Sequence, residues 1–143
     1  TAFTWLPAPF DGFGVQANYT LAMADNTNIF DALTGEELTQ AGLSRDTYNL
    51  ILYYDKGPLN ARIAYNSRSP YFTGGGSAGT AGRRAGTEYV DGKVTYDVTP
   101  QFSVFAEAQN LTGEIETSFA GSIRINERSY SGKRFFVGGT YRY

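Results

Sequence analysis

Cysteine and histidine are both absent from this chain of 143 residues. Without cysteine the protein can form neither a disulfide nor a thiolate nucleophile, and without histidine it has no imidazole base. Zinc sites built from these residues are excluded, as are hydrolases that depend on a Ser–His or Asp–His pair. An enzyme that uses other residues is the third alternative; we expect a protein that is not an enzyme, and we assign it no catalytic residue, no metal ligand and no cofactor.

Long apolar runs and a strong charge imbalance are also lacking. The net charge of −2 gives no indication of nucleic-acid binding. No apolar run approaches the roughly 18 residues of a membrane helix, and the mean hydropathy is −0.33. A β-barrel in a membrane remains compatible with that average, because its lipid-facing and lumen-facing residues alternate along each strand. The first residues lack a signal-peptide pattern, but an exported protein would have lost that peptide, so its absence does not argue for the cytoplasm.

Aromatic residues and glycine are abundant, with 11 Tyr, 10 Phe and 17 Gly. Tyrosine suits membrane interfaces, where its apolar ring and its hydroxyl are both accommodated. The segment Lys133–Tyr143 alternates between an aromatic or apolar face and a face that carries two arginines. Its length fits a tilted membrane-spanning strand of about 9–11 residues.

Alternation of period two recurs along the chain and predicts strands. They cover residues 13–23, 46–55, 59–68, 88–98, 102–111 and 133–143, and Thr1–Leu6 is predicted as the tail of a seventh. Short connections at 7–12, 56–58 and 99–101 alternate with long loops at 24–45, 69–87 and 112–132. Outer-membrane barrels sort their periplasmic turns and extracellular loops in this way. The sequence thus predicts an all-β fold, an antiparallel transmembrane β-barrel with its C-terminus on the periplasmic side.

The same alternation assigns side chains to the two faces of the predicted sheet. We expect one set to face lipid: Val15, Leu21, Leu50, Leu52, Ile63, Val94, Val104 and Val137. We expect another set to line the lumen: Gln16, Asn49, Arg62, Lys93, Glu107 and Arg134. If Thr99–Gln101 forms a three-residue loop, Val98 faces Phe102 and Lys93 lies opposite Glu107, where opposite charges contribute roughly 0.2–1 kcal/mol.

Four segments, in this order, carry a resemblance to a known family. They are Leu6-Pro-Ala-Pro-Phe-Asp-Gly-Phe-Gly-Val-Gln-Ala-Asn-Tyr-Thr20; Tyr48–Lys56 with Ala61–Arg68; Tyr96–Thr99 with Glu107–Thr112; and Gly132–Tyr143. The ordered set resembles the C-terminal part of a TonB-dependent receptor of the bacterial outer membrane. The resemblance implies that residues 1–143 supply C-terminal strands, about seven of the roughly 22 that form such a barrel. The plug domain and the earlier strands of the family are absent from this sequence.

What the resemblance implies for function is active uptake of a nutrient, either a saccharide or a siderophore-like compound, in the outer membrane of a Gram-negative bacterium. The implied partners are outer-membrane lipid and lipopolysaccharide, the rest of the receptor, the TonB complex reached through the absent N-terminal part, and a surface lipoprotein. The alternative is a passive porin-like channel, or a structural or adhesion barrel assembled with other chains. The transported compound and the oligomeric state stay open.

Cargo-binding residues are expected in the long loops and at the strand ends next to them, because loops on a rigid scaffold carry recognition. Aromatic rings beside arginine and asparagine suit sugar faces or anionic groups. The candidates are Asn28, Phe30, Arg68, Tyr71, Phe72, Arg83, Arg84, Arg128 and Tyr130. Two alternatives stay open: the aromatics belong to an outer aromatic belt, and the arginines pair with lipopolysaccharide phosphate.

Three further motifs favour no additional site. Gly74–Gly79 fits G-x-G-x-x-G, but no helical pattern follows it, so we interpret it as a flexible surface loop. Asp91, Asp97 and Glu107 are interpreted as part of a polar wall and not as a pair of glycosidase carboxylates. Asp25–Asp31 lacks the ligand spacing of an EF-hand, and calcium binding in this loop stays open.

Overall fold

The computed structural model describes residues 1–24, 28–75, 80–121 and 124–143. Within them the chain forms a short 3-10 helix, η1, at Phe10–Gly12 and then only strands. The strands are β1 (Phe13–Leu21), β2 (Asp46–Lys56), β3 (Leu59–Arg68), β4 (Tyr71–Gly75), β5 (Ala81–Arg84), β6 (Thr87–Asp97), β7 (Phe102–Gln109), β8 (Glu116–Ala120), β9 (Arg124–Ser129) and β10 (Arg134–Tyr141). Every pairing between them is antiparallel, so the predicted all-β antiparallel fold is confirmed.

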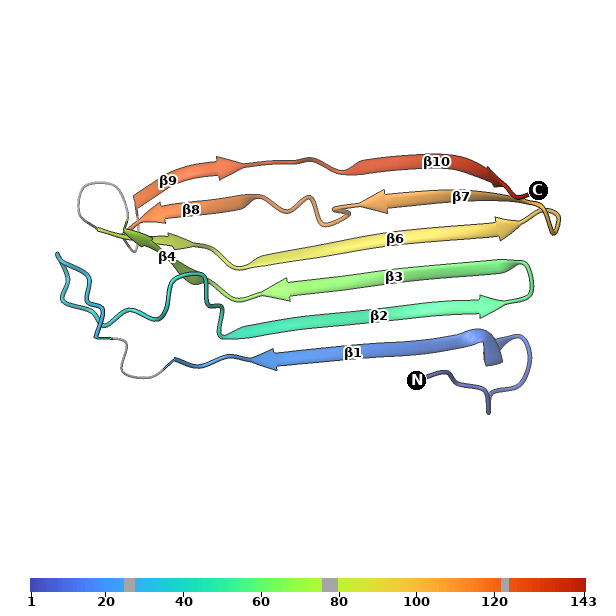
Figure 1. Cartoon of the computed structure of the whole chain (residues 1–143), viewed down its shortest axis with the longest axis horizontal. Coiled ribbons are helices and arrows are strands. Elements are labelled where there is room, and N and C mark those ends of the chain that lie inside the picture. Colours follow the sequence, from blue (N-terminus) through green and yellow to red (C-terminus); the bar gives the residue numbers. More distant parts are fainter. Residues whose placement is uncertain (25–27, 76–79, 122–123) are drawn as a thin grey trace.

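The six longer strands form one sheet in the order β1-β2-β3-β6-β7-β10. They run side by side, with the short turns and both chain ends at one end of the sheet (Figure 1). Their bounds lie within two residues of the predicted ranges, since alternation of period two is a local signal. The predicted register of β6 and β7 is confirmed, with Lys93 opposite Glu107 and Tyr96 opposite Val104.

The predicted loops at 69–87 and 112–132 are not irregular throughout, and this part of the prediction is wrong. They contain β4, β5, β8 and β9, which form a second sheet in the order β4-β5-β8-β9. These strands continue β3, β6, β7 and β10 at the long-loop end (Figure 1). Tyr71 pairs with Arg84 in the same register in which Arg68 pairs with Thr87. These segments are rich in glycine and polar residues and show no apolar–polar alternation, yet their backbone N–H and C=O groups can still pair with neighbouring strands.

The junctions between the two sheets have local causes. Pro70 lies between β3 and β4 in the chain, and it has no N–H to donate to a neighbouring strand. Asn110, between β7 and β8, has a left-handed backbone with φ of 54° and is almost completely buried. Its side chain accepts a hydrogen bond from the Glu114 N–H at 2.8 Å and donates one to the Gly132 carbonyl at 3.2 Å. Asn110 thus ties the start of β8 to the start of β10.

The N-terminal segment differs from the expected seventh strand. Its first three residues pair with the start of β1 through one isolated bridge, between Ala2 and Gly14, in which the Phe3 N–H donates to the Phe13 carbonyl and the Val15 N–H to the Thr1 carbonyl, both at 2.8 Å. The backbone then turns, with the Leu6 N–H donating to the Phe3 carbonyl at 3.0 Å. Prolines 7 and 9 offer no N–H to a strand ladder, and η1 leads directly into β1. The large sheet therefore contains six strands and not seven.

The sheet is open in the part of the chain that the structure describes. β1 lies at one edge and β10 at the other, and they do not pair with each other. The described residues therefore confirm the antiparallel sheet of the predicted fold, but they do not form a closed barrel.

No helix in the described residues is long and apolar enough to cross a membrane.

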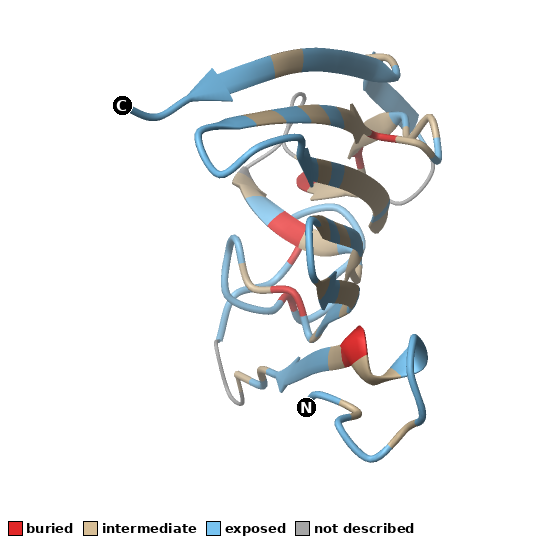
Figure 2. Ribbon diagram, turned by 90° about the vertical axis from the view of Figure 1, so that its right-hand side faces the viewer, coloured by how far each residue is buried: buried red, intermediate tan, exposed pale blue. Residues whose placement is uncertain are grey.

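Among the described residues, buried side chains are few and most lie at the long-loop end. Leu38, Phe72 and Ala81 form one small cluster. Figure 2 shows that most of the ribbon is exposed or half-buried, with burial confined to short stretches. In the large sheet only Gly14 is buried, because the Tyr53 ring lies directly against its backbone.

Candidate functional site

The large sheet has one face made almost entirely of apolar side chains. Residues that lie directly opposite each other in an antiparallel pair share a face, so the registers identify its members. Leu52 lies opposite Val15 and Ile63, and Ala106 lies opposite Val94 and Val137. All eight residues predicted to face lipid lie on this face, which we call the apolar face. Its side chains are exposed; for example, Leu52 is 44% and Val137 is 84% exposed.

Charged residues occur on the apolar face only at the ends of strands. Asp46 and Lys56 are the first and last residues of β2, and Glu88 is the second residue of β6. The Lys56 ammonium is bonded to the carboxylate of Asp11, which lies in η1. This hydrogen bond holds the pKa of Asp11 below its ordinary value. Between these ends, the apolar face carries no charge on any of the six strands.

Aromatic rings border the apolar face at both ends. At the short-turn end the border consists of Phe13, Tyr54, Tyr96, Phe102 and Tyr141, and at the long-loop end of Tyr19, Tyr48, Tyr65 and Phe135. Phe13 meets Tyr54 edge-on with ring centroids 4.9 Å apart, and Tyr19 stacks on Tyr48 at 4.8 Å. In β1, β2 and β10 the two borders are separated by the same interval, from Phe13 to Tyr19, from Tyr48 to Tyr54 and from Phe135 to Tyr141.

Both aromatic borders are slanted in the same sense across the sheet. The residue of β10 in the cross-strand row of Phe13 is Val137, and Tyr141 lies four residues beyond it. At the other end Phe135 lies in the row of Val15, and Tyr19 lies four residues beyond that row. Four residues rise about 14 Å, and five strand spacings cover about 24 Å. The apolar band is therefore inclined by about 30° to the cross-strand rows.

The opposite face is polar, and it holds all six residues predicted to line the lumen. Arg62 lies opposite Lys93, which lies opposite Glu107. Lys93 Nζ approaches Glu107 Oε2 at 3.5 Å, and the Gln109 amide donates to Glu107 Oε1 at 2.8 Å. Gln16, Asn49 and Arg134 share this face through the same registers. Asp91 and Asp97 lie there too, which agrees with their interpretation as part of a polar wall.

Exposure along β7 runs opposite to the usual pattern of a soluble sheet. Phe102, Val104 and Ala106 are exposed, while the alternate residues Ser103 and Glu107 are half-buried. A soluble half-buried strand turns its apolar side chains toward the core and its polar ones to water. In β7 the polar face is the more enclosed of the two.

At the long-loop end the segment 28–45 packs against β4 and β5. Asp31 is buried, and its carboxylate accepts hydrogen bonds from the N–H groups of Ala81 at 2.9 Å, Leu33 at 2.9 Å and Thr34 at 3.1 Å. These bonds, with Ala81 contributing most, hold the pKa of Asp31 below its ordinary value. Arg83 of β5 pairs with Glu36 at 2.7 Å. We call residues 28–45 together with β4 and β5 the loop-end assembly.

Several cargo-binding candidates take part in internal contacts of this assembly. Phe72 is buried against Leu38 and Ala81. Arg68 donates to the Gly42 carbonyl and Ser44 hydroxyl, and its guanidinium lies 3.9 Å from the centre of the Tyr71 ring. Arg84 pairs with Glu116 of β8 at 2.9 Å. Arg83 and Arg84 therefore lie in a paired strand, in contrast to the expected flexible loop.

The other four cargo-binding candidates, Asn28, Phe30, Arg128 and Tyr130, are exposed. Phe30 and Tyr130 are 58% and 60% exposed, and Arg128 is exposed on β9. Asn28 has a left-handed backbone with φ of 51°. Gly74 and Gly75 end β4, whereas residues 76–79 of the glycine motif, and residues 25–27 of the segment considered for calcium, lie outside the described residues.

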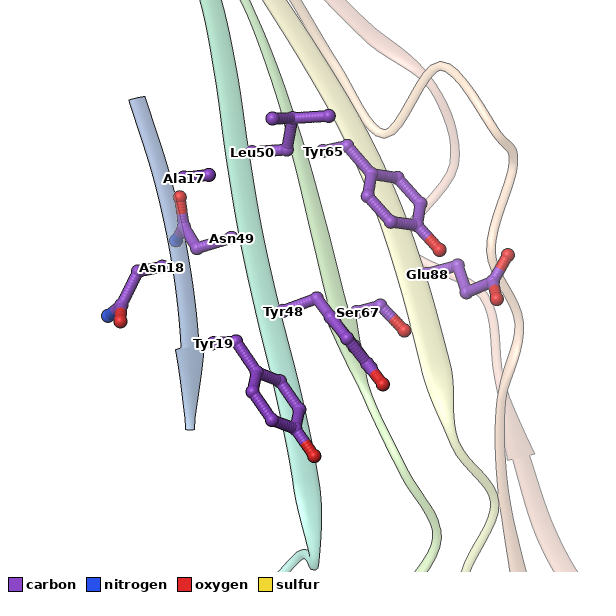
Figure 3. Close-up of a pocket in the computed structure, with 9 residues that line it drawn as sticks. All are labelled: Ala17, Asn18, Tyr19, Tyr48, Asn49, Leu50, Tyr65, Ser67 and Glu88. Carbon is purple, nitrogen blue, oxygen red and sulfur yellow. The ribbon is translucent and has the colours of Figure 1, made fainter. Parts of the chain in front are cut away.

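The structure also shows a hollow that the sequence did not indicate. It has a volume of about 630 Å³ and lies at the long-loop end of the apolar face. Its wall is formed by Ala17, Tyr19, Tyr48, Leu50, Tyr65, Ser67 and Glu88, with Asn18 and Asn49 behind them (Figure 3). The signal that could have found it is the turn at Lys56–Pro58. Continuing that hairpin register along the strands places Tyr48 opposite Ser67.

In the comparison with known proteins, no family model, no curated protein and no solved structure matches the chain.

Proposed function

We propose that this chain supplies strands to the wall of an outer-membrane transporter of the TonB-dependent kind, with its apolar face in lipid and its polar face toward the lumen. The observation that carries the proposal is the apolar face itself, which is free of charge between its ends and bordered by aromatic rings on both sides. Transmembrane barrels have an outward apolar band flanked by aromatic girdles and a polar interior.

The dimensions of the apolar band support this proposal. An interval of six residues between the two aromatic borders corresponds to about 20 Å along a strand. The rings at both borders extend this band toward the height of about 25 Å that barrels present to lipid. The inclination of about 30° is near the strand tilt of about 35–45° in membrane barrels. A sheet that was covered by another protein layer would have no reason to incline both aromatic borders by the same amount.

The open edges support a wall that further strands complete. An unpaired strand edge in lipid leaves backbone groups without partners, at several kcal/mol each. Six strands are fewer than the roughly eight that the smallest barrels require. β1 and β10 therefore take partner strands in the assembled transporter, and cargo passes along the polar face that Arg62, Lys93 and Arg134 share.

The assignment of the two faces can be tested with single spin labels, which the absence of cysteine makes straightforward. Leu52→Cys and Asn49→Cys place a nitroxide on the apolar and the polar face of β2. In the assembled transporter, reconstituted in lipid vesicles, we expect the label at position 52 to collide with oxygen more often than with a water-soluble nickel complex. The label at position 49 should show the opposite preference. A lipid-exposed position 49 would reverse the faces, and two water-exposed labels would remove the chain from the bilayer.

Active uptake is distinguished from a passive channel by its energy requirement. In cells whose outer membrane carries the assembled protein, uptake of a labelled oligosaccharide or of a ferric siderophore is measured before and after the proton gradient is collapsed. We expect uptake of one of these compounds to stop. Uptake that continues unchanged would favour the passive porin-like alternative.

A further inference from the structure

A second hollow lies on the polar side of the sheet, at the long-loop end. It has a volume of about 110 Å³, and its wall includes Arg68, Tyr71, Arg84, Thr87, Glu116 and Thr117. Arg68 lies opposite Thr87, and it shares the polar face of β3 with Arg62. Tyr89, two residues after Thr87, donates its hydroxyl hydrogen to Glu116 Oε1 at 2.7 Å, so Glu116 is turned to the same side. In the proposed transporter this side faces the lumen, and we call the hollow the lumen pocket.

Arg68 is held in the lumen pocket by uncharged groups. Its guanidinium donates to the Gly42 carbonyl and the Ser44 hydroxyl, and it lies 3.9 Å from the centre of the Tyr71 ring. The two hydrogen bonds leave other N–H donors of the guanidinium available. No carboxylate in the described part of the chain forms an ion pair with Arg68. Arg68 therefore brings a positioned positive charge with spare donors to the pocket.

The other two charges in the wall of the pocket neutralise each other. Arg84 Nη1 pairs with Glu116 Oε2 at 2.9 Å, and both side chains are 43% exposed. The charge of Arg68 is thus left over, and a guanidinium binds carboxylates through parallel N–H···O bonds. A ligand that complements the pocket therefore places one anionic group on Arg68.

The polar groups around Arg68 decide between carriers of such an anionic group. Thr87 and Thr117 offer hydroxyls that both donate and accept, and the Glu116 carboxylate accepts from ligand hydroxyls. A compact polyanion would bring further negative charge next to Glu116, where like charges repel. The volume equals that of about four water molecules at about 30 Å³ each, which suits one carboxylate with its adjoining hydroxyls.

Resting on the proposed transport function, we propose that the lumen pocket binds the carboxylate of an acidic sugar, so that the cargo is an oligosaccharide that contains a uronic acid. The carboxylate lies on the Arg68 guanidinium, and neighbouring sugar hydroxyls bond to Thr87 and Glu116. The contacts of Arg68 with Gly42, Ser44 and Tyr71 hold its side chain before the sugar arrives, which lowers the entropic cost of binding.

A matched pair of disaccharides tests this in the assembled transporter, purified in detergent micelles. Cellobiouronic acid carries one carboxylate, and cellobiose is the same disaccharide with a CH₂OH group in that place. Titration calorimetry at neutral pH measures the affinity for each. We expect the acid to bind roughly ten- to hundredfold more tightly than cellobiose, the range for hydrogen bonds to a charged group. Ferric citrate, a carboxylate-rich siderophore complex, should bind more weakly than the acid.

Variants then locate the carboxylate. Arg68→Gln should bring the acid and cellobiose to about equal affinity. Glu116→Gln should strengthen binding of the acid, because it removes a negative charge from the pocket. Arg142→Gln is the matched control: Arg142 is exposed at the short-turn end, where its N–H bonds to the Gln101 carbonyl. It changes the net charge as Arg68→Gln does and should leave the preference for the acid intact.

Equal affinity of the unmodified transporter for the acid and cellobiose, or equal losses in the variants at positions 68 and 142, would overturn the inference. Tighter binding of ferric citrate that depends on Arg68 would overturn the choice of a sugar. Each of these results leaves the membrane function standing, because the spin labels at positions 49 and 52 test that independently. A water-exposed label at position 52 would overturn the membrane function, and this inference with it.

Discussion

The six-stranded sheet and the loop-end assembly differ in whether their apolar side chains are buried within the chain. The loop-end assembly buries a small apolar cluster, Leu38, Phe72 and Ala81, among its own residues, with Phe72 only 9% exposed. The six-stranded sheet leaves its large apolar side chains open, and the side chain of Val94, in its middle, is 40% exposed. Burial of apolar area from water is the main force in folding, at roughly 25 cal/mol per Å². The assembly obtains this stabilisation internally, whereas the apolar face of the sheet does not obtain it from the described part of the chain.

The contrast predicts different responses to the loss of one aromatic side chain. Phe72→Ala should cost about 3–5 kcal/mol locally, because it leaves a cavity among Leu38 and Ala81. Phe135→Ala, on the apolar face where the ring is 68% exposed, should cost much less. Amide hydrogen exchange in residues 28–45 and in β4 and β5 measures the first effect. Equal protection losses in both variants would mean that the two regions do not differ as described.

A charge in the middle of each face sharpens the comparison within the sheet. Val94→Arg places an arginine in the charge-free band, and we expect a cost of about 2–4 kcal/mol in a bilayer. Thr95→Arg, the next residue on the polar face, should change the free energy of unfolding little. Denaturant unfolding of the assembled protein from lipid vesicles measures both variants. A larger cost for Thr95→Arg would contradict the assignment of the faces.

Packing on the polar face is tested at a glycine of β10. A Cβ at Gly138 would lie 2.6 Å from the Phe105 ring, so Gly138→Ala must displace that ring. We expect a cost of about 1–3 kcal/mol from this overpacking. Gly92→Ala is the control, because its Cβ would meet nothing closer than 3.9 Å. Thermal unfolding of the assembled protein in detergent micelles compares the two variants, and equal midpoints would contradict the close packing of Phe105 on β10.

The ion pair between Lys93 and Glu107 should contribute less. A double-mutant cycle with Lys93→Met and Glu107→Gln should give a coupling free energy of about 0.2–1 kcal/mol, which is typical of opposite charges across a strand pair. The coupling should shrink as salt is raised if water fills the polar face. A coupling of zero at low salt would argue against the β6–β7 register in solution.

Acid should loosen the loop-end assembly while leaving the apolar face unaffected. The pKa of Asp31 is lowered in the folded chain, mainly by the N–H of Ala81. Its contribution to stability is present above the ordinary pKa of about 3.9 and is lost as the pH falls through the lower folded value. We expect the Ala81 amide to lose exchange protection below about pH 4, and Asp31→Asn to weaken this pH dependence. Unchanged protection in acid would mean that the carboxylate does not hold the segment.

The sequence by itself determined the six long strands and the division of their side chains into two faces. Alternation of period two is a property of neighbouring residues, so Leu50, Leu52 and Tyr54 share a face wherever the strand is placed. The β6–β7 register followed from the three-residue turn, and the same reasoning applied to the turn at Lys56–Pro58 would have placed Tyr48 opposite Ser67. The alternation and the turns were enough to predict that Arg62, Lys93 and Glu107 share one polar face.

Only the tertiary structure decided the loop-end assembly, the slant of the aromatic borders and the hollow at Glu88. β5, Ala81–Arg84, carries no alternation that marks it as a strand, and it becomes one because β4 and β8 supply backbone partners on both sides. The burial of Phe72 depends on Leu38, which is far away in sequence. The slant depends on the offsets accumulated across five strand pairs. Such features arise from long-range pairing, whose partners are chosen by the whole sheet and not by any local stretch of chain.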